Sequence, residues 1–253
     1  MNAKDLKKQL EKEYPYRIEM HAHTTPQSTC GELLPEEVIE LYHKKGYDAV
    51  TITNHFMGYV NFGEYLTGDY MKGETKADKL ALYLEAYERA KAEAEKHGMK
   101  AYLGIEIRFA RENNNDYLIY GADAQVADIC YDHHEGTLAD FRKNVKLEKS
   151  VFVQAHPFRN GMVEVSPELL DGVETFNMHP GHNSGVGFSV RFAKENNIKI
   201  KTAGSDFHHR DRNHEAVSAL RTKVLPEDSF HLAEILKSGD YLFEIGEDSI
   251  VLP

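Results

Sequence analysis

The stretch Val151-Phe-Val-Gln-Ala-His-Pro-Phe-Arg159 decides the fold class of this chain. Residues 151–154 form a short, mostly apolar run, which is typical of a buried β-strand. His156 and Arg159 follow the run directly, so polar side chains stand where the strand ends. Barrels of alternating strands and helices build their active sites at the carboxyl ends of the strands. The stretch therefore predicts a strand that leads into a functional site.

The same alternation continues through the chain. Short apolar runs predict strands over residues 17–20, 49–53, 102–109, 117–120, 151–154, 172–176 and 198–202. Helical spacing and helix-end signals predict helices over residues 35–45, 78–97, 184–196 and 229–237. Strands that alternate with helices indicate an α/β protein with a parallel sheet and helical crossovers.

Two architectures fit this alternation, an open doubly wound sheet and a barrel. Polar clusters directly after successive strands favour the barrel, because that is where its active-site loops lie. No G-x-G-x-x-G or G-x-x-x-x-G-K-[ST] motif follows a strand, so a nucleotide-binding sheet has no support. We find no internal repeat or linker and expect residues 1–253 to form a single domain.

Charge and composition narrow the classes of function. The chain has 41 acidic and 30 Lys or Arg residues, a net charge of -11, which argues against a long nucleic acid as partner. No apolar stretch approaches the roughly 18 residues that span a bilayer, so we expect no membrane segment. Residues 1–14 lack the apolar core of a signal peptide, which favours a cytoplasmic location. The 14 histidines are unusual, and histidine is the commonest metal ligand.

Three clusters place histidines after predicted strands. His21 and His23 are two residues apart and point to the same side of an extended chain, where they can reach one metal ion. Asp206 and His208 repeat that spacing, and His55 ends the run over residues 51–55. Each cluster taken alone also fits an interpretation without a metal. A single H-x-H often arises by chance, and a lone histidine is often a hydrogen-bonded pocket residue.

Glu106 lies inside the apolar segment Leu103-Gly-Ile-Glu-Ile107. A buried glutamate is costly unless it is paired or bound to a metal. Gly104 permits a close approach of another part of the chain nearby. The structural alternative is a buried salt bridge with Arg108, which strand alternation puts on the same side as Glu106. That pair also suits a site for a metal and a phosphate.

Together these clusters predict a metal site of histidines and carboxylates at the ends of successive strands. Imidazole and carboxylate ligands without a convincing thiolate suit zinc, manganese or iron. The ligands exceed the four of one tetrahedral site, so we expect two or three divalent ions and at least one bridging carboxylate. Clustered divalent ions stabilise the attacking and leaving oxygens of an in-line displacement and activate water. This combination indicates phosphoester hydrolysis.

The motif set resembles the polymerase-and-histidinol-phosphatase (PHP) family. The match runs in order over roughly residues 16–224 and comprises H-x-H-T at His21, an apolar strand ending in His55, G-I-E at Glu106, A-H-P-F-R at His156, and G-S-D-x-H at Asp206. The resemblance implies a distorted (β/α)7 TIM-like barrel with a trinuclear metal centre. It is similar in particular to stand-alone, histidinol-phosphatase-like members.

The resemblance also implies a division of the ligands. His21, His23, Glu106 and Asp206 would hold the first metal, Glu106 and His156 the second, and His55 and His208 the third. We assign Glu106 and Asp206 as the catalytic carboxylates. Arg159 resembles a phosphate-binding arginine. Arg108 is a second candidate anchor, and His179 is a candidate substrate contact, although a loop-capping role fits His179 equally well.

Two positions depart from the family pattern. Asp116 stands where the family often has a histidine, and we assign it to the second metal. The segment Ser28-Thr29-Cys30-Gly31 stands where the family usually has a histidine or aspartate. Cys30 there either substitutes as a ligand or forms part of a tight turn.

We expect a phosphoric ester hydrolase acting on a small phosphorylated metabolite, with histidinol phosphate as the first candidate by analogy. A phosphodiesterase or nuclease is an alternative, because Tyr59, Phe62, Tyr65 and Tyr70 are available to stack a base. A non-catalytic, metal-bound regulatory domain is a third. These aromatics lie in the long segment 56–76, which is either a functional lid or a surface insertion.

Overall fold

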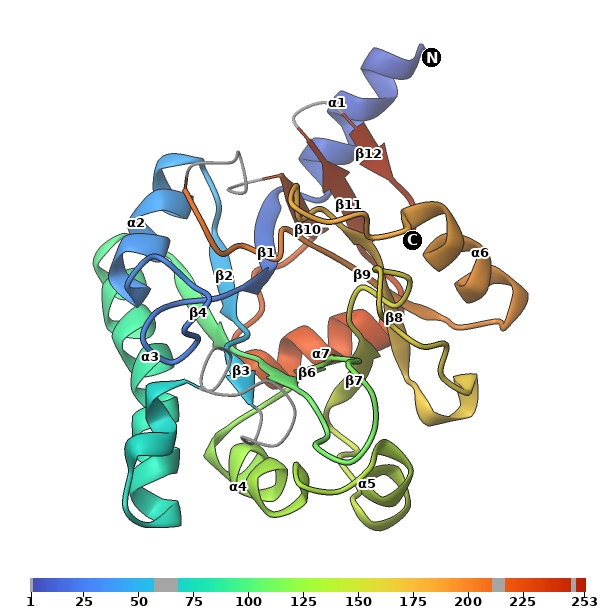
Figure 1. Ribbon diagram of the computed structural model, residues 1–253. Coiled ribbons are helices and arrows are strands. Elements are labelled where there is room, and N and C mark those ends of the chain that lie inside the picture. Colours follow the sequence, from blue (N-terminus) through green and yellow to red (C-terminus); the bar gives the residue numbers. More distant parts are fainter. Residues whose placement is uncertain (1, 57–67, 211–216, 247–248) are drawn as a thin grey trace.

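The computed structural model describes residues 2–56, 68–210, 217–246 and 249–253 (Figure 1). Within these ranges the α-helices are α1 (Ala3–Glu13), α2 (Pro35–Lys44), α3 (Lys76–Lys96), α4 (Ala124–His133), α5 (Leu138–Asn144), α6 (Val186–Glu195) and α7 (Ser229–Ser238). Two short 3-10 helices are η2 (Asp69–Lys72) and η3 (Pro167–Leu169). The helices lie around a central set of strands.

The strands form two six-stranded mixed sheets. The first has the order β12-β11-β10-β1-β2-β4 and the second the order β3-β5-β6-β7-β8-β9. Their bounds are β1 (Tyr16–Ala22), β2 (Ala49–Ile52), β3 (His55–Phe56), β4 (Lys100–Leu103), β5 (Ile105–Ile107), β6 (Tyr117–Tyr120), β7 (Val151–Gln154), β8 (Gly172–Asn177), β9 (Ile200–Gly204), β10 (Ser218–Thr222), β11 (Leu242–Ile245) and β12 (Ser249–Val251).

The two sheets meet at two places. β4 continues into β5 through Gly104, whose N–H donates to Ile52 at 2.9 Å. A Cβ at Gly104 would lie 2.8 Å from the Thr53 methyl group, so the close approach expected at this glycine is present. On the other side, Phe207 follows β9 and its N–H donates to the His21 carbonyl at 3.0 Å. The α/β class is therefore correct, with two sheets in place of the single predicted one.

The expectation of an all-parallel sheet is wrong in part. β6 pairs antiparallel with both β5 and β7, and β10, β11 and β12 form an antiparallel extension beside β1. Only a short loop without a helix joins β5 to β6, and a parallel pair needs a crossover of a dozen or more residues. The pairs β1–β2, β2–β4, β7–β8 and β8–β9 are parallel as expected.

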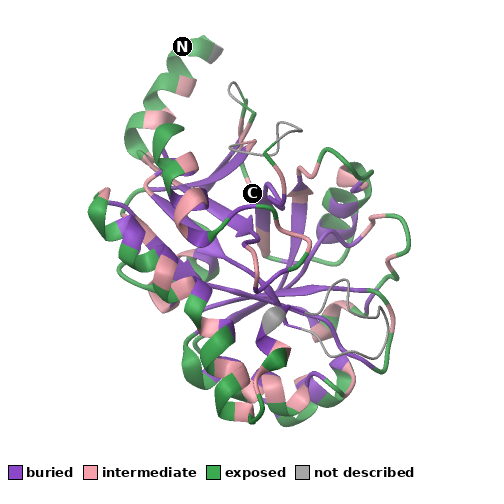
Figure 2. Ribbon diagram, turned by 60° about the vertical axis from the view of Figure 1, so that its left-hand side comes forward, coloured by how far each residue is buried: buried purple, intermediate pink, exposed green. Residues whose placement is uncertain are grey.

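Helices α2, α3, α4, α5, α6 and α7 each bury one face and expose the other, whereas α1 projects from the body and has no buried residue among those described (Figure 2). α2, α3, α6 and α7 lie within two residues of the predicted helices at each end. Thr75 caps α3 with its side chain and Asp78 completes a capping box, which fixes where this helix begins. Helices α1, α4 and α5 and strands β10–β12 were not predicted, because their periodic signals are short or weak.

Candidate metal centre

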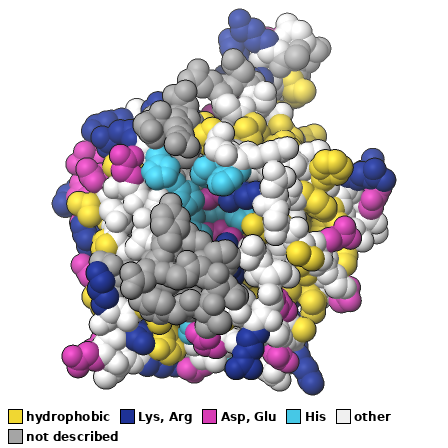
Figure 3. Space-filling model, in the orientation of Figure 1, with side chains coloured by type: hydrophobic (Ala, Val, Ile, Leu, Met, Phe, Trp, Pro, Cys, Tyr) yellow, Lys and Arg dark blue, Asp and Glu magenta, His cyan; other side chains and the backbone are white. Residues whose placement is uncertain are grey.

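The predicted site residues gather at one end of the strands. His21 lies near the end of β1, Glu106 in β5, His156 just after β7 and Asp206 just after β9. They line, or lie directly behind, a cavity of about 460 Å³ that also contains His208. Figure 3 shows histidine side chains around a hollow in this face, with acidic and basic side chains inside it. The chain thus brings residues far apart in sequence to one place.

The Glu106 carboxylate stands at the centre of this group and is fully buried. Its Oε2 lies 2.9 Å from His55 Nδ1 and 3.2 Å from His23 Nε2. Its Oε1 lies 3.4 Å from His21 Nε2 and 3.3 Å from His156 Nε2. One carboxylate therefore faces ring nitrogens of four histidines.

Three groups of side chains are close enough to share a metal ion, each with one ligand atom per residue and all ligand atoms within 4.8 Å of one another. They are His21 with His23 and Asp206; His55 with Glu106 and Asp116; and His23 with Cys30, His55 and His208. His23 and His55 each belong to two groups, so the groups form one continuous centre. His156 is not in these groups but contacts Glu106, and its Nε2 lies 3.7 Å from Asp116 Oδ2.

Buried atoms without hydrogen bonds test whether these residues suit a metal. Among the described residues, Glu106 Oε2, His55 Nδ1 and His156 Nδ1 are buried and make no hydrogen bond, although the first two lie 2.9 Å apart. A buried polar atom left unpaired costs about 1–3 kcal/mol, and such atoms are rare in native proteins. A divalent cation between Glu106 Oε2 and His55 Nδ1 would satisfy both lone pairs. The donor set therefore fits a metal ion.

The carboxylates are held in their charged form. Burial alone would raise the pKa of the Glu106 carboxyl, but the charges of His55 and His21 outweigh it and hold that pKa well below its usual range. Burial likewise opposes ionisation of Asp206, and Arg159 together with His21 lowers its pKa well below the ordinary value. Ionised carboxylates are the form that binds metals.

Two candidate ligands have an uncommon backbone conformation. His156 has φ +30° and Asp206 has φ +52°, in the left-handed region that side chains other than glycine rarely adopt. Residues in such conformations tend to cluster at active sites, where surrounding contacts hold them in place. In each case the residue turns the chain directly after a strand, which aims its side chain into the centre.

Close packing beneath the ligands depends on one glycine. A Cβ at Gly204 would lie 2.4 Å from His21 Cβ and 2.7 Å from Glu174 Oε1. No side chain fits there unless the candidate ligand His21 moves. Gly204 ends β9 and so lets this strand approach β1 at the floor of the site.

Glu174, in β8, supports the ligands and was not identified from the sequence. Its Oε1 accepts a hydrogen bond from His21 Nδ1 at 2.9 Å, and its Oε2 accepts from the His156 N–H at 2.9 Å and from Asn177 Nδ2 at 2.9 Å. A carboxylate only accepts, so His21 carries its proton on Nδ1 and presents Nε2 to the centre. Glu174 stands in an apolar strand, the same signal that singled out Glu106, and could have been found by it.

Glu19 was also missed, although it too is a glutamate within a predicted strand. It is fully buried, and its Oε1 accepts hydrogen bonds from the His21 N–H and the Ser205 N–H at 2.9 Å each. Glu19 therefore ties the β1 strand, which carries His21, to the segment that carries Asp206. It lies behind the ligands rather than among them.

The predicted phosphate-binding residues line the same cavity. Arg159 forms an ion pair with Asp206 and donates to Asn177 Oδ1 at 2.9 Å. Arg108 forms two hydrogen bonds with Asp116, at 2.6 and 2.5 Å. The alternative of a buried Arg108–Glu106 salt bridge is thus replaced by a pair with Asp116, and both arginines contact candidate metal ligands.

His179 stands at the rim of the cavity. Its ring lies 5.4 Å from that of His208 between centroids, and its Nδ1 accepts a hydrogen bond from the Gly181 N–H at 3.0 Å. The loop-capping contact considered for this residue is therefore present. His182, which the sequence did not single out, lines the cavity beside it.

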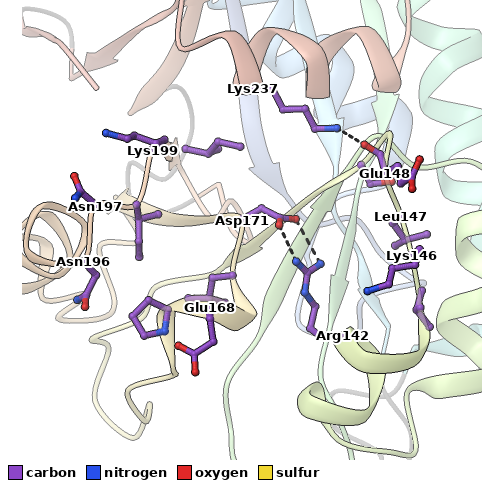
Figure 4. A pocket seen from close by; sticks show the side chains of 16 residues that line it. Arg142, Lys146, Leu147, Glu148, Glu168, Asp171, Asn196, Asn197, Lys199 and Lys237 are labelled. Atoms are coloured by element: carbon purple, nitrogen blue, oxygen red, sulfur yellow. Dashed lines mark hydrogen bonds and ion pairs between the residues drawn. The ribbon is translucent and has the colours of Figure 1, made fainter.

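A larger cavity of about 690 Å³ lies at the opposite ends of β7, β8 and β9 (Figure 4). In its lining, Arg142 binds Asp171 at 2.7 Å and Lys237 donates to the Glu148 carbonyl at 2.6 Å. None of the three candidate ligand groups lies there. We therefore place the site in the smaller cavity, where the ligands are.

The segment 56–76 is only partly described. Tyr59, Phe62 and Tyr65 lie outside the described residues, so neither a lid nor base stacking is tested for them. Tyr70 is 1% exposed and packs against Phe56 and Tyr83 in the core, so its proposed role in stacking a base is wrong.

The fold and the site define an α/β protein with a buried centre of histidines and carboxylates suited to divalent metal ions. The PHP domain matches residues 19–184, more than half of the chain, and the protein belongs to this family. A comparison with curated proteins finds no match. Among the described residues, no helix has the length and apolar character to cross a membrane.

Two of the solved structures that match show the shared fold. One is a two-domain protein from Bacteroides vulgatus containing a predicted PHP-like metal-dependent phosphoesterase, with a TM-score of 0.61 and 15% identity over 92% of this chain and 65% of that chain. The other is PsfC from Pseudomonas syringae, with a TM-score of 0.55 and 12% identity over 81% of each chain. This chain thus spans slightly less than two thirds of the first structure.

Proposed function

We propose that this protein is a metal-dependent phosphoesterase that removes phosphate from a small metabolite, and that residues 1–253 act as one domain. The observation that carries the proposal is the position of Glu106, whose carboxylate lies 2.9–3.4 Å from ring nitrogens of four histidines. A buried carboxylate among imidazoles is a bridging arrangement for divalent ions, and family membership supports the same use of these residues.

The ligand groups assign roles to the chain's own residues. His21, His23 and Asp206 would hold one ion, and Glu106, Asp116 and His156 a second, with zinc, manganese or iron as the metals that suit them. His55 lies within reach both of this second ion and of Cys30 and His208. Divalent ions supply charge stabilisation for the phosphoryl group and activate the attacking water. Glu106 and Asp206 act by fixing the ions, and Glu174 keeps His21 in the tautomer that presents Nε2.

The arginines favour a terminal phosphate as substrate. Arg159 and Arg108 line the cavity beside the ligands, and a guanidinium can grip two phosphate oxygens. Arg159 Nε is buried and has no partner among the described residues, so it retains a donor for a substrate. A cavity of about 460 Å³ is of the size that takes a small metabolite. Histidinol phosphate is the first candidate, from the family resemblance.

We also infer that the two sheets close into the distorted (β/α)7 barrel of this family and that the protein is cytoplasmic. Support for closure comes from the Phe207 hydrogen bond to β1 and from the continuity of β4 with β5.

Phosphate release is the test. Purified protein would be assayed against a panel of phosphomonoesters that includes histidinol phosphate, against a phosphodiester, and after treatment with a chelator. We expect monoester turnover that disappears on chelation and returns with added metal, and at least two transition-metal ions per chain. A preference for the diester would favour the nuclease alternative. Full metal content without hydrolysis of any ester would favour a regulatory domain.

A further inference from the structure

Cys30 is a possible metal ligand at the site that the function proposed above does not use. It lies between β1 and α2 and lines the same cavity as the candidate ligands. Its Sγ and one ring nitrogen from each of His23, His55 and His208 all lie within 4.8 Å of one another. In a tetrahedral zinc site with bonds of about 2.0–2.3 Å, ligand atoms stand about 3.3–3.7 Å apart. The observed spread is compatible with such a site.

Backbone hydrogen bonds hold Cys30 in place at both ends of its turn. The Ser28 N–H donates to the Thr24 carbonyl at 2.9 Å on the β1 side. The Glu32 N–H donates to the His208 carbonyl at 2.9 Å on the other side. Because the turn is fixed to the residue that supplies one of the imidazoles, Cys30 and His208 are placed together. The tight turn expected here is present and is compatible with a ligand role for Cys30.

Ser28 connects the same turn to the two other histidines. Its Oγ accepts a hydrogen bond from the His55 N–H at 2.8 Å and lies 3.2 Å from His23 Nδ1. With Nδ1 engaged by the hydroxyl, His23 has Nε2 left for a metal. That atom also faces Asp206 Oδ1 at 3.5 Å, so it serves only one of the two groups to which His23 belongs.

Two of the four residues in the group of Cys30 also belong to neighbouring ligand groups, so this group depends on Cys30 for one of its two unshared ligands. His23 is shared with the group of His21 and Asp206, and His55 is shared with the group of Glu106 and Asp116. Cys30 and His208 belong to no other group. Without the thiol, this part of the centre would have one ligand of its own.

Building on the proposed function, we propose that Cys30 is a thiolate ligand of one ion in the centre, together with His208 and His55, and that it selects zinc over manganese. The thiol proton is released to solvent when the metal binds. Thiolate is a soft ligand that favours zinc, whereas manganese prefers oxygen ligands. An aspartate at this position would supply an oxygen ligand, which suits manganese.

Cobalt provides a direct spectroscopic test. Metal-free protein would be loaded with Co²⁺, and the near-ultraviolet absorption would be recorded for wild type, Cys30→Ser and Cys130→Ala. Cys130 is fully buried in the hydrophobic core, away from the site, and is the matched control. We expect a thiolate-to-cobalt charge-transfer band in wild type and Cys130→Ala that is absent in Cys30→Ser. A wild type without the band, or Cys30→Ser with it, would overturn the proposal.

A measurement on unmutated protein guards against misfolding of the variant. Zn²⁺ should slow the modification of Cys30 by a thiol reagent at least about tenfold, which is the smallest loss of metal affinity usual when a contact at a metal site is removed. Mn²⁺ should slow the modification far less. Equal modification rates with and without Zn²⁺ would refute the ligand role.

Cys30→Asp should restore metal content but shift the preference towards Mn²⁺, and a variant that still prefers Zn²⁺ would contradict the selectivity.

The same samples separate this inference from the proposed function. Wild type that shows the band and the protection but hydrolyses no phosphoester would refute the phosphoesterase and leave Cys30 as a ligand. Wild type that hydrolyses phosphoesters but shows neither band nor protection would refute the ligand role alone.

Discussion

Replacing Glu174 by glutamine removes one charge behind the metal centre while keeping the shape of the side chain. Glu174 is 1% exposed and accepts three hydrogen bonds of 2.9 Å, from His21 Nδ1, the His156 N–H and Asn177 Nδ2. Glutamine has only one acceptor oxygen, and its NH₂ group would face an N–H donor. One hydrogen bond is therefore lost if the NH₂ group faces His21, and two are lost if it faces the His156 N–H and Asn177. The orientation of His21 or of the turn at His156 is then no longer fixed.

The magnitude follows from that lost contact. Hydrogen bonds to charged groups contribute about 1.5–3 kcal/mol. Losing a carboxylate that orients a metal-bound histidine typically lowers metal affinity about 10–100-fold, which is about 1.4–2.8 kcal/mol. The two estimates agree. We expect Glu174→Gln to raise the metal Kd about 10–100-fold and to recover much of its hydrolysis at saturating metal.

The assay is a titration of metal-free protein with Zn²⁺ against a chromophoric chelator, followed by kinetics at low and saturating metal. Glu244→Gln is the matched control, because Glu244 is also a buried carboxylate but pairs with Arg17 and Arg221 in the first sheet. It should lower the thermal midpoint without changing metal affinity. A Glu174→Gln protein whose metal Kd stays within about twofold of wild type, below the range for such contacts, would refute the reasoning.

Three further changes probe the site. Asp206→Ala or Glu106→Ala should abolish hydrolysis and lower metal content while circular dichroism stays native, and unchanged activity would contradict the assignment. Arg159→Ala should lower kcat/KM on a monoester roughly tenfold to several hundredfold, about 1.5–3 kcal/mol, and less on a diester, in steady-state kinetics; an equal loss on both would argue against recognition of a terminal phosphate. Gly204→Ala should weaken metal binding, because the new Cβ would lie 2.4 Å from His21 Cβ, and a calorimetric metal titration matching wild type would show that the strands adjust.

Much of the candidate site could be predicted because its residues follow strands directly. His21 and His23 are two residues apart, the period of an extended chain, so both side chains could be assigned to one side. His156 was found because it follows the apolar run 151–154 directly. Glu106 was found because a charged side chain in an apolar strand needs a partner. The same reasoning applied to Glu19 and Glu174 would have found them too.

Other features depend on contacts between distant parts of the chain. The antiparallel course of β6 depends on which neighbours it meets, and the split of the strands into two sheets depends on where Gly104 lets the chain bend past Thr53. Neither feature can be predicted from the spacing of apolar residues within one strand or helix. The burial of Tyr70 likewise depends on Phe56 and Tyr83, which lie in other elements.

The sequence by itself determined the α/β class, most of the strand and helix positions, and the set of histidines and carboxylates that follow the strands, because these depend on local spacing and on the cost of burying a charge. Only the tertiary structure decided which of these side chains lie close enough to share a metal ion. Glu106 faces four histidines, and Cys30 joins His208, because hydrogen bonds between separate elements hold their backbones together. Ligand sharing is a matter of distances in space, and distances between residues remote in sequence are set by packing.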